Sequence, residues 1–248
     1  MTATYAELTR CDPNPVKRWL QAQRLLDAAR LVREPDLGTV VDYGGGDGAL
    51  AVALLRSERT RHVKCFEPAP SLRAEADAML AGVTGADLVA SAADLPSDWA
   101  RTAFCLEVFE HLPPEETDVA LDHLHRVLAP GGLLVIGVPV EIGPPALAKG
   151  LFRMARRPGA FDGRLSSILA ATLGRPPVER ERATIGPGLA YFPHHLGFDH
   201  RRLLERVATR FEVLRQVGSP LGGPAAFNTE LNILVRKRDV TAPQEANR

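Results

Sequence analysis

The sequence predicts an α/β fold in which a mostly parallel β-sheet carries helices on both faces. Short apolar runs alternate with helical patterns along most of the chain, which is typical of this class. Two further apolar runs near 210–217 and 229–236, joined by a turn rich in glycine and proline, predict a closing antiparallel hairpin. The 248 residues, 45% of them hydrophobic, suit one large domain with an insertion.

The elements follow one another in a regular order. A helix is expected over residues 15–33, behind a proline suited to a first helical turn. The sheet and its helices are then expected at strand 38–43, helix 48–57, strand 62–66, helix 70–81, strands 86–90 and 103–107, helix 114–128, strand 132–138 and helix 199–208.

The connection between strand 132–138 and helix 199–208 is unusually long. It has about sixty residues, where ~2–6 are usual in such folds, so we expect it to form helices of its own at 144–156 and 164–173. The apolar side of the first of these helices is expected to pack onto the sheet, and the alternatives are that it covers a hydrophobic substrate or meets a membrane surface. The predicted organisation is a helical segment over 1–35, a main domain over 36–238 that includes a helical cap at 140–198, and a disordered tail over 239–248.

Composition excludes several classes of protein. Lysine plus arginine equals aspartate plus glutamate at 30 each, so a dedicated nucleic-acid binder is not expected. The three cysteines lack paired spacing, which argues against a disulfide framework or a zinc site and favours a reducing compartment. No apolar run approaches the ~20 residues that span a bilayer. We therefore expect a cytoplasmic protein with no transmembrane segment.

A glycine-rich turn follows the first predicted strand. Glycines in such a turn let the backbone adopt positive φ and approach a ligand closely. Two classes of cofactor use such loops. As Gly44-x-Gly46-x-x-Ala49, with Glu67 downstream as a ribose-binding acid, the turn fits a nicotinamide-dependent oxidoreductase. A non-catalytic nucleotide-binding module is a third interpretation, because fold does not fix function.

The alternative pattern, Asp42-x-Gly44-x-Gly46-x-Gly48, resembles the first motif of class I S-adenosylmethionine-dependent methyltransferases. Later features, including Arg126-Val127-Leu128-Ala129-Pro130-Gly131-Gly132-Leu133, are similar to that family over most of residues 36–238. The resemblance implies a Rossmann-like seven-stranded sheet and S-adenosylmethionine as cofactor. It also implies that Asp42 and the three glycines hold the cofactor, that Glu67 binds its ribose, and that Asp94 and Leu95 contact its adenine.

The segment Glu107-Val108-Phe109-Glu110-His111 follows the fourth predicted strand, at the edge where open α/β sheets bind ligands. Its Glu-x-x-Glu-His spacing resembles that of ubiquinone-pathway O-methyltransferases and small-RNA terminal 2′-O-methyltransferases, in which the triplet holds a divalent cation. The resemblance implies a Mg²⁺ site formed by Glu107, Glu110 and His111, with Glu107 also beside the cofactor. Similar strings occur in relatives without metal, so a metal-free site stays open.

Two histidines are candidate catalytic bases. Without a metal, His111 can accept a proton at neutral pH, although a histidine there can also serve only as a hydrogen-bonding group. His195 is the second candidate, from a run that also holds His194 and His200 and that offers either a further base or a fourth metal ligand. His200 is instead expected in the first turn of a helix that Asp199 caps.

The expected function is transfer of a methyl group to a small molecule, most simply to a hydroxyl of a natural product, a sugar or a lipid-like compound. Arginines and a lysine of the insertion favour an acceptor with an anionic group. These basic residues are Lys149, Arg153, Arg156, Arg157, Arg164, Arg175, Arg180 and Arg182. The oligomeric state does not follow from the sequence.

Overall fold

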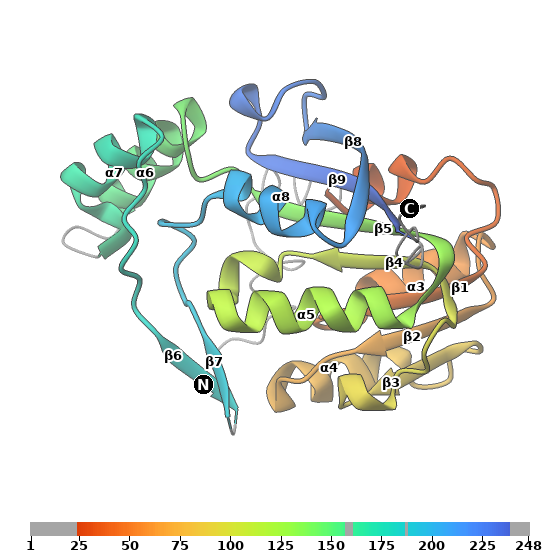
Figure 1. Ribbon diagram of the computed structural model, residues 1–248. Coiled ribbons are helices and arrows are strands. Elements are labelled where there is room, and N and C mark those ends of the chain that lie inside the picture. The colour runs from red at the N-terminus through yellow and green to blue at the C-terminus, as the bar shows by residue number, and fades with distance from the viewer. Residues whose placement is uncertain (1–23, 157–160, 187, 239–248) are drawn as a thin grey trace, which may run out of the picture.

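The computed structural model describes residues 24–156, 161–186 and 188–238. Its centre is a seven-stranded sheet in the order β3-β2-β1-β4-β5-β9-β8 (Figure 1). Strands β1 to β5 are parallel, and β9 runs antiparallel to both β5 and β8. The strands are β1 (Thr39–Tyr43), β2 (His62–Phe66), β3 (Ala86–Val89), β4 (Ala100–Leu106), β5 (Leu128–Pro139), β8 (Phe211–Ser219) and β9 (Glu230–Lys237). This topology confirms the predicted sheet and its closing hairpin.

Helices cover both faces of the sheet. On one face lie α5 (Pro114–Val127) and α8 (His200–Ala208), and on the other lie α3 (Ala49–Arg56), α4 (Pro70–Leu80) and the helical residues 24–31. Strand side chains alternate between the two cores, as the pleat requires: Ala103 and Cys105 contact the first, while Phe104 contacts the second. The expected helix 15–33 is present over 24–31; residues 1–23 and the predicted tail lie outside the described residues.

Strand β5 begins four residues earlier than the sequence predicts. Ala100 of β4 pairs with Leu128, and the next paired position joins Thr102 to Leu133, so residues 129–132 form a bulge inside the strand. Gly131 adopts a φ of 68° within this bulge. Gly131 and Gly132 therefore lie within β5 and interrupt its pairing, instead of preceding the strand.

The insertion after β5 contains the two predicted helices, α6 (Pro144–Arg156) and α7 (Leu165–Thr172). It also contains a small antiparallel sheet of β6 (Ala183–Gly186) and β7 (Leu189–Tyr191), which the sequence did not predict. In Figure 1 the helical pair and the small sheet lie beyond the end of the main sheet at which β5 finishes.

The expectation that the apolar side of α6 packs onto the sheet is wrong. Leu147, Leu151 and Phe152 are 36, 45 and 59% exposed. The inward side of the helix instead carries Lys149 and Arg153, whose charges meet a buried carboxylate described below. No helix in the described part of the chain is long and apolar enough to cross a bilayer.

Candidate functional site

The glycine loop connects β1 to α3. Gly44, Gly46 and Gly48 have φ values of 76°, 57° and 79°, a region that favours glycine. A Cβ atom on Gly44 would lie 2.4 Å from Cγ2 of Val108. The loop therefore packs directly against the segment that follows β4, so the predicted cofactor residues and the predicted catalytic segment are neighbours.

Glu67 follows β2 and holds the glycine loop in place. One of its carboxylate oxygens accepts a hydrogen bond of 2.9 Å from the Gly46 amide, and the other accepts one of 2.8 Å from the Ala69 amide. The side chain is buried, which raises its pKa, while the two amides act in the opposite direction. The carboxylate thus lies beside the loop, where the sequence expected a ribose-binding acid.

Asp42 lies in β1 beneath the loop and is almost fully buried. Burial, followed by the nearby charges of Glu67 and Asp47, raises its pKa from 3.8 to about 7. Its Oδ2 atom has no hydrogen-bond donor among the described residues. An ionised Asp42 is therefore poorly compensated in the protein without a ligand.

Replacing Asp42 with asparagine is expected to stabilise the ligand-free protein in a pH-dependent way. In the unfolded chain Asp42 is ionised above pH 4, whereas in the folded protein it stays protonated until about pH 7. Wild-type stability therefore falls as the pH rises through this window, by up to about 1.4 kcal/mol per pH unit from this residue. The Tm advantage of the variant should grow between pH 5 and pH 7, and an advantage that stays constant would show that Asp42 is ionised throughout.

Asp94 and Leu95 lie at the end of a short 3₁₀ turn, Ala92–Asp94, that follows β3. Asp94 is exposed and Leu95 is buried, with its carbonyl accepting a 2.7 Å hydrogen bond from Arg126. The turn stands at the same edge of the sheet as the glycine loop, because β3, β2 and β1 are adjacent and parallel. The predicted adenine contacts therefore remain a prediction that this placement allows.

Glu107 does not join the other two residues of the predicted metal triplet. It follows β4 with a φ of 57°, and its carboxylate lies 3.3 Å from a guanidinium nitrogen of Arg24. The other terminal nitrogen of Arg24 lies 2.6 Å from Glu230, the first residue of β9. Glu107 thus belongs to a charged cluster with Arg24 and Glu230.

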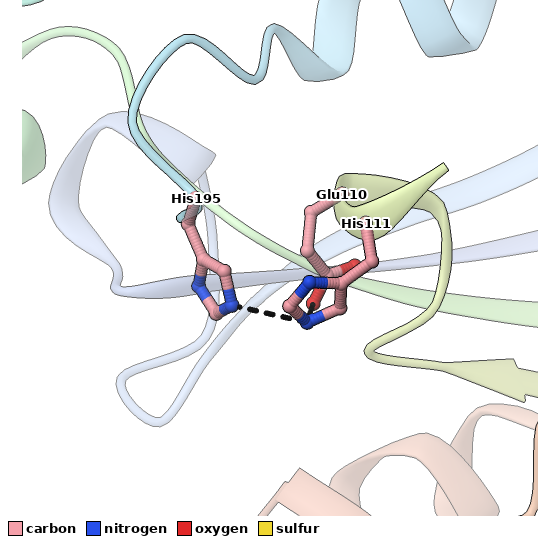
Figure 2. Close-up of side chains that lie close together, drawn as sticks. All are labelled: Glu110, His111 and His195. Atoms are coloured by element: carbon pink, nitrogen blue, oxygen red, sulfur yellow. Dashed lines mark hydrogen bonds and ion pairs between the residues drawn. The ribbon is translucent and has the colours of Figure 1, made fainter. Parts of the chain in front are cut away.

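The two candidate bases lie together (Figure 2). His111 is in the 3₁₀ turn Phe109–His111, and its Nδ1 lies 2.8 Å from the carbonyl oxygen of Phe192. Since a carbonyl only accepts, Nδ1 of His111 carries the proton and Nε2 of the neutral ring carries a lone pair. This Nε2 lies 3.2 Å from Nε2 of His195. Burial lowers the pKa of both rings, that of His195 to about 4.

Glu110 lies beneath the imidazole pair and is fully buried. Neither of its carboxylate oxygens has a hydrogen-bond donor among the described residues, and Oε1 is 3.9 Å from Nε2 of His111. Burial, with the nearby charge of Glu107, raises its pKa well above the ordinary value. One ligand atom each from Glu110, His111 and His195 lie within 4.8 Å of one another. The structure therefore gathers Glu110, His111 and His195, a different set from the predicted triplet.

Arg180 supports this arrangement from the insertion. Its guanidinium donates to the backbone carbonyls of Glu110 and His194, and it stacks 4.1 Å from the ring centre of Phe192. Burial lowers its pKa to about 10. Arg180 thus ties the turn that carries His111 to the loop that carries His195. As expected, Asp199 caps α8 and His200 begins it.

The sequence analysis missed two buried carboxylates at this edge of the sheet. Glu141, just after β5, is fully buried and accepts hydrogen bonds from Lys149 and Arg153, which hold its pKa near 2. Glu230 begins β9. A charged residue at the end of an apolar run was the available signal for Glu141, whereas Glu230 reaches the site only because β9 pairs with β5.

Comparisons with known proteins agree with this geometry. No curated protein matches the chain. Among solved structures, the chain is similar to the N-methyltransferase NodS from Bradyrhizobium japonicum WM9 in complex with S-adenosylhomocysteine, at 15% identity over 93% of this chain and 91% of that one, with a TM-score of 0.57. It is also similar to the 1,6-didemethyltoxoflavin N1-methyltransferase of Burkholderia thailandensis, at 17% identity over 94% and 85% of the two chains, with a TM-score of 0.56.

A third solved structure, the PH0226 protein from Pyrococcus horikoshii OT3, has 11% identity and a TM-score of 0.63 over 94% of this chain and 96% of that one. At these identities the three structures show a shared fold. The family is shown by a model described as a methyltransferase domain, which matches residues 17–160, more than half of the chain. The family supports S-adenosylmethionine rather than a nicotinamide dinucleotide as the cofactor, and the chain belongs to the methyltransferase domain family.

Proposed function

We propose that this methyltransferase transfers the methyl group of S-adenosylmethionine to a hydroxyl of a small molecule. The observation that supports a hydroxyl is the pair formed by His111 and His195. A hydroxyl must lose its proton when its oxygen is methylated, and Nε2 of His111 is an acceptor fixed by the Nδ1 hydrogen bond to Phe192. This base belongs to the segment that contacts the glycine loop, through Val108 and Gly44.

The proposed cofactor site follows the carboxyl edge of the sheet. The glycine loop cradles the cofactor, Glu67 binds the ribose hydroxyls, and Asp94 with Leu95 contacts the adenine. When bound, the sulfonium supplies the methyl group. The protein aligns the acceptor oxygen with that methyl group, and alignment of this kind contributes up to ~7–11 kcal/mol in well-oriented reactions. In the ligand-free protein His195 donates to Nε2 of His111 and holds the ring. Because Nε2 has one lone pair, the acceptor hydroxyl replaces His195 as its partner before His111 takes the proton.

We do not propose that the acceptor carries an anionic group. Lys149 and Arg153 are engaged by Glu141, and Arg182 lies 2.8 Å from Glu115, so three of the basic residues that favoured an anion have acidic partners. Arg180 faces backbone carbonyls. The proposed acceptor therefore needs a hydroxyl group but not a negatively charged group.

The test uses methyl-labelled S-adenosylmethionine and a panel of small molecules in matched pairs, with a hydroxyl in one member and an amine in the other. Carbon-13 NMR of the product distinguishes a methyl on oxygen from one on nitrogen. We expect labelled O-methyl products. Products labelled only on nitrogen would contradict the proposal, because an uncharged amine needs no base before it attacks.

A metal-assisted version of the same reaction is favoured by one observation, the two undonated and fully buried oxygens of Glu110. Glu110, His111 and His195 fit a divalent cation, and the Nδ1 hydrogen bond of His111 to a carbonyl is typical of metal-binding histidines. Two imidazoles and one carboxylate suit zinc, iron or manganese better than Mg²⁺, which prefers oxygen ligands. A bound cation would lower the pKa of the acceptor hydroxyl.

Removal of metal distinguishes the mechanism with His111 as the base from the metal-assisted mechanism. The protein is dialysed against a chelator, its metal content is measured by mass spectrometry, and methyl transfer is assayed before and after adding back Zn²⁺ or Mn²⁺. The base mechanism predicts an unchanged rate in the metal-free protein. A rate that falls on chelation and returns with one cation would replace it with the metal-assisted version.

A further inference from the structure

Helix α6 has an inverted distribution of side chains. Its charged residues Lys149 and Arg153 face the interior, where they pair with Glu141. The exposed side chains between 147 and 155 are all apolar: Leu147, Ala148, Leu151, Phe152 and Ala155. Because burial of Glu141 fixes which side of the helix turns inward, the apolar side is left facing solvent.

Helix α7 also exposes apolar side chains, although its inward side is apolar as well. Its inward side packs Ile168 against Gly150 of α6, while Leu165, Leu169 and Leu173 are 53, 48 and 79% exposed. These three leucines are spaced four residues apart and so form one stripe along the helix. Two helices that contact each other therefore both present apolar side chains to solvent, which is uncommon unless the surface binds something. We call these exposed side chains of α6 and α7, from Leu147 to Leu173, the α6–α7 surface.

The sequence that forms this surface is rich in basic residues. Exposed arginines stand at both ends of the α7 stripe, Arg164 immediately before it and Arg175 immediately after it. The sequence from 142 to 178 holds one acidic residue, Asp162, which is buried. A second copy of this surface would bring only further positive charge, whereas an apolar surface bordered by arginines complements a bilayer with anionic headgroups.

From these observations we infer that the α6–α7 surface binds the surface of a lipid bilayer that contains anionic headgroups. The leucines and Phe152 enter the boundary between headgroups and acyl chains, and the arginines contact lipid phosphates. The protein lies on the bilayer and does not cross it. The surface belongs to the insertion that also carries His195.

The full-length protein tests this by flotation with vesicles of phosphatidylcholine alone or mixed with phosphatidylglycerol. We expect flotation with the mixed vesicles, weakened roughly fivefold for each of Arg164→Gln and Arg175→Gln. The double variant Leu169→Gln, Leu173→Gln should lose flotation altogether. The matched control is Val119→Gln on α5, because Val119 is 47% exposed and lies outside the surface; it should float like the wild type.

Three results would overturn the inference. The first is failure of the wild type to float with either vesicle, and the second is equal binding to both vesicle types, which would remove the role of charge. The third is a dimer, seen by analytical ultracentrifugation, that the double leucine variant abolishes while vesicle binding persists, because a second copy would then cover this surface. Since both leucines are exposed, the variants should fold normally, which their Tm verifies.

Discussion

Replacing Glu67 with alanine is expected to weaken S-adenosylhomocysteine binding by roughly 100-fold or more. Each hydrogen bond between a charged group and the ribose contributes about 1.5–3 kcal/mol, and two such bonds would be lost. The variant also loses the acceptor for the Gly46 and Ala69 amides, so the glycine loop is no longer held. Isothermal calorimetry measures the change in affinity directly.

Two further variants make this result specific. Asp77→Ala removes an exposed carboxylate from α4 and should leave the affinity unchanged. Glu67→Gln keeps the size of the side chain but has one acceptor oxygen for two backbone donors, so its affinity should lie between those of the wild type and Glu67→Ala. Wild-type affinity in Glu67→Ala would exclude Glu67 from the cofactor site.

Replacing His111 with glutamine is expected to lower kcat for a hydroxyl acceptor by about 10²–10⁴, the usual contribution of a general base. The affinity for S-adenosylhomocysteine should not change, because His111 contacts the loop of the insertion and not the glycine loop. The rate is measured with the best hydroxyl acceptor from the labelled panel. This combination separates a catalytic loss from a general loss of fold.

The matched control is His125→Gln, since His125 lies on α5 and, within the described ranges, its ring contacts the carbonyl of Arg238 and the ring of Phe211. It should retain full activity. His195→Gln should give a smaller loss than His111→Gln, because His195 orients the base. A His111→Gln enzyme that works at the wild-type rate would rule out His111 as the proton acceptor.

The positions of the glycine loop and of Glu67 could be predicted from the sequence because their signals are local. Gly44, Gly46 and Gly48 adopt a positive φ, which glycine permits and a turn requires, and the position of Glu67 follows from the end of an apolar strand. Parallel strands then bring these ends to one edge without further information. Thus the placement of this part of the site depends on residues close together in the chain.

The acceptor side could not be predicted in the same way, because its contacts join distant residues. His111 meets His195 only through the path of the insertion, which pairs the backbone of His111 with Phe192. Glu107 turns toward Glu230 because β9 lies beside β5, an order that no local pattern contains. The predicted metal triplet rested on the resemblance of its Glu-x-x-Glu-His spacing to metal-binding methyltransferases, whereas Glu107 lies before the short 3₁₀ turn that carries Glu110 and His111.

The orientation of α6 could not be predicted from the periodicity of its apolar residues. The pattern correctly divides the helix into an apolar and a charged side, but it does not say which side faces inward. Hydrophobic burial favours the apolar side, yet the structure places Lys149 and Arg153 inward because the buried carboxylate of Glu141 needs partners. The electrostatic energy that outweighs hydrophobic burial here comes from Glu141, which lies outside helix α6.

Calorimetric titration of the wild-type protein with S-adenosylhomocysteine, and separately with NADH, tests the central claim most directly. The glycine loop, Glu67 and the turn at Asp94 together predict micromolar binding of S-adenosylhomocysteine and no binding of NADH. Binding of NADH together with no binding of S-adenosylhomocysteine would contradict the account. The glycine loop would then be interpreted as a dinucleotide-binding loop.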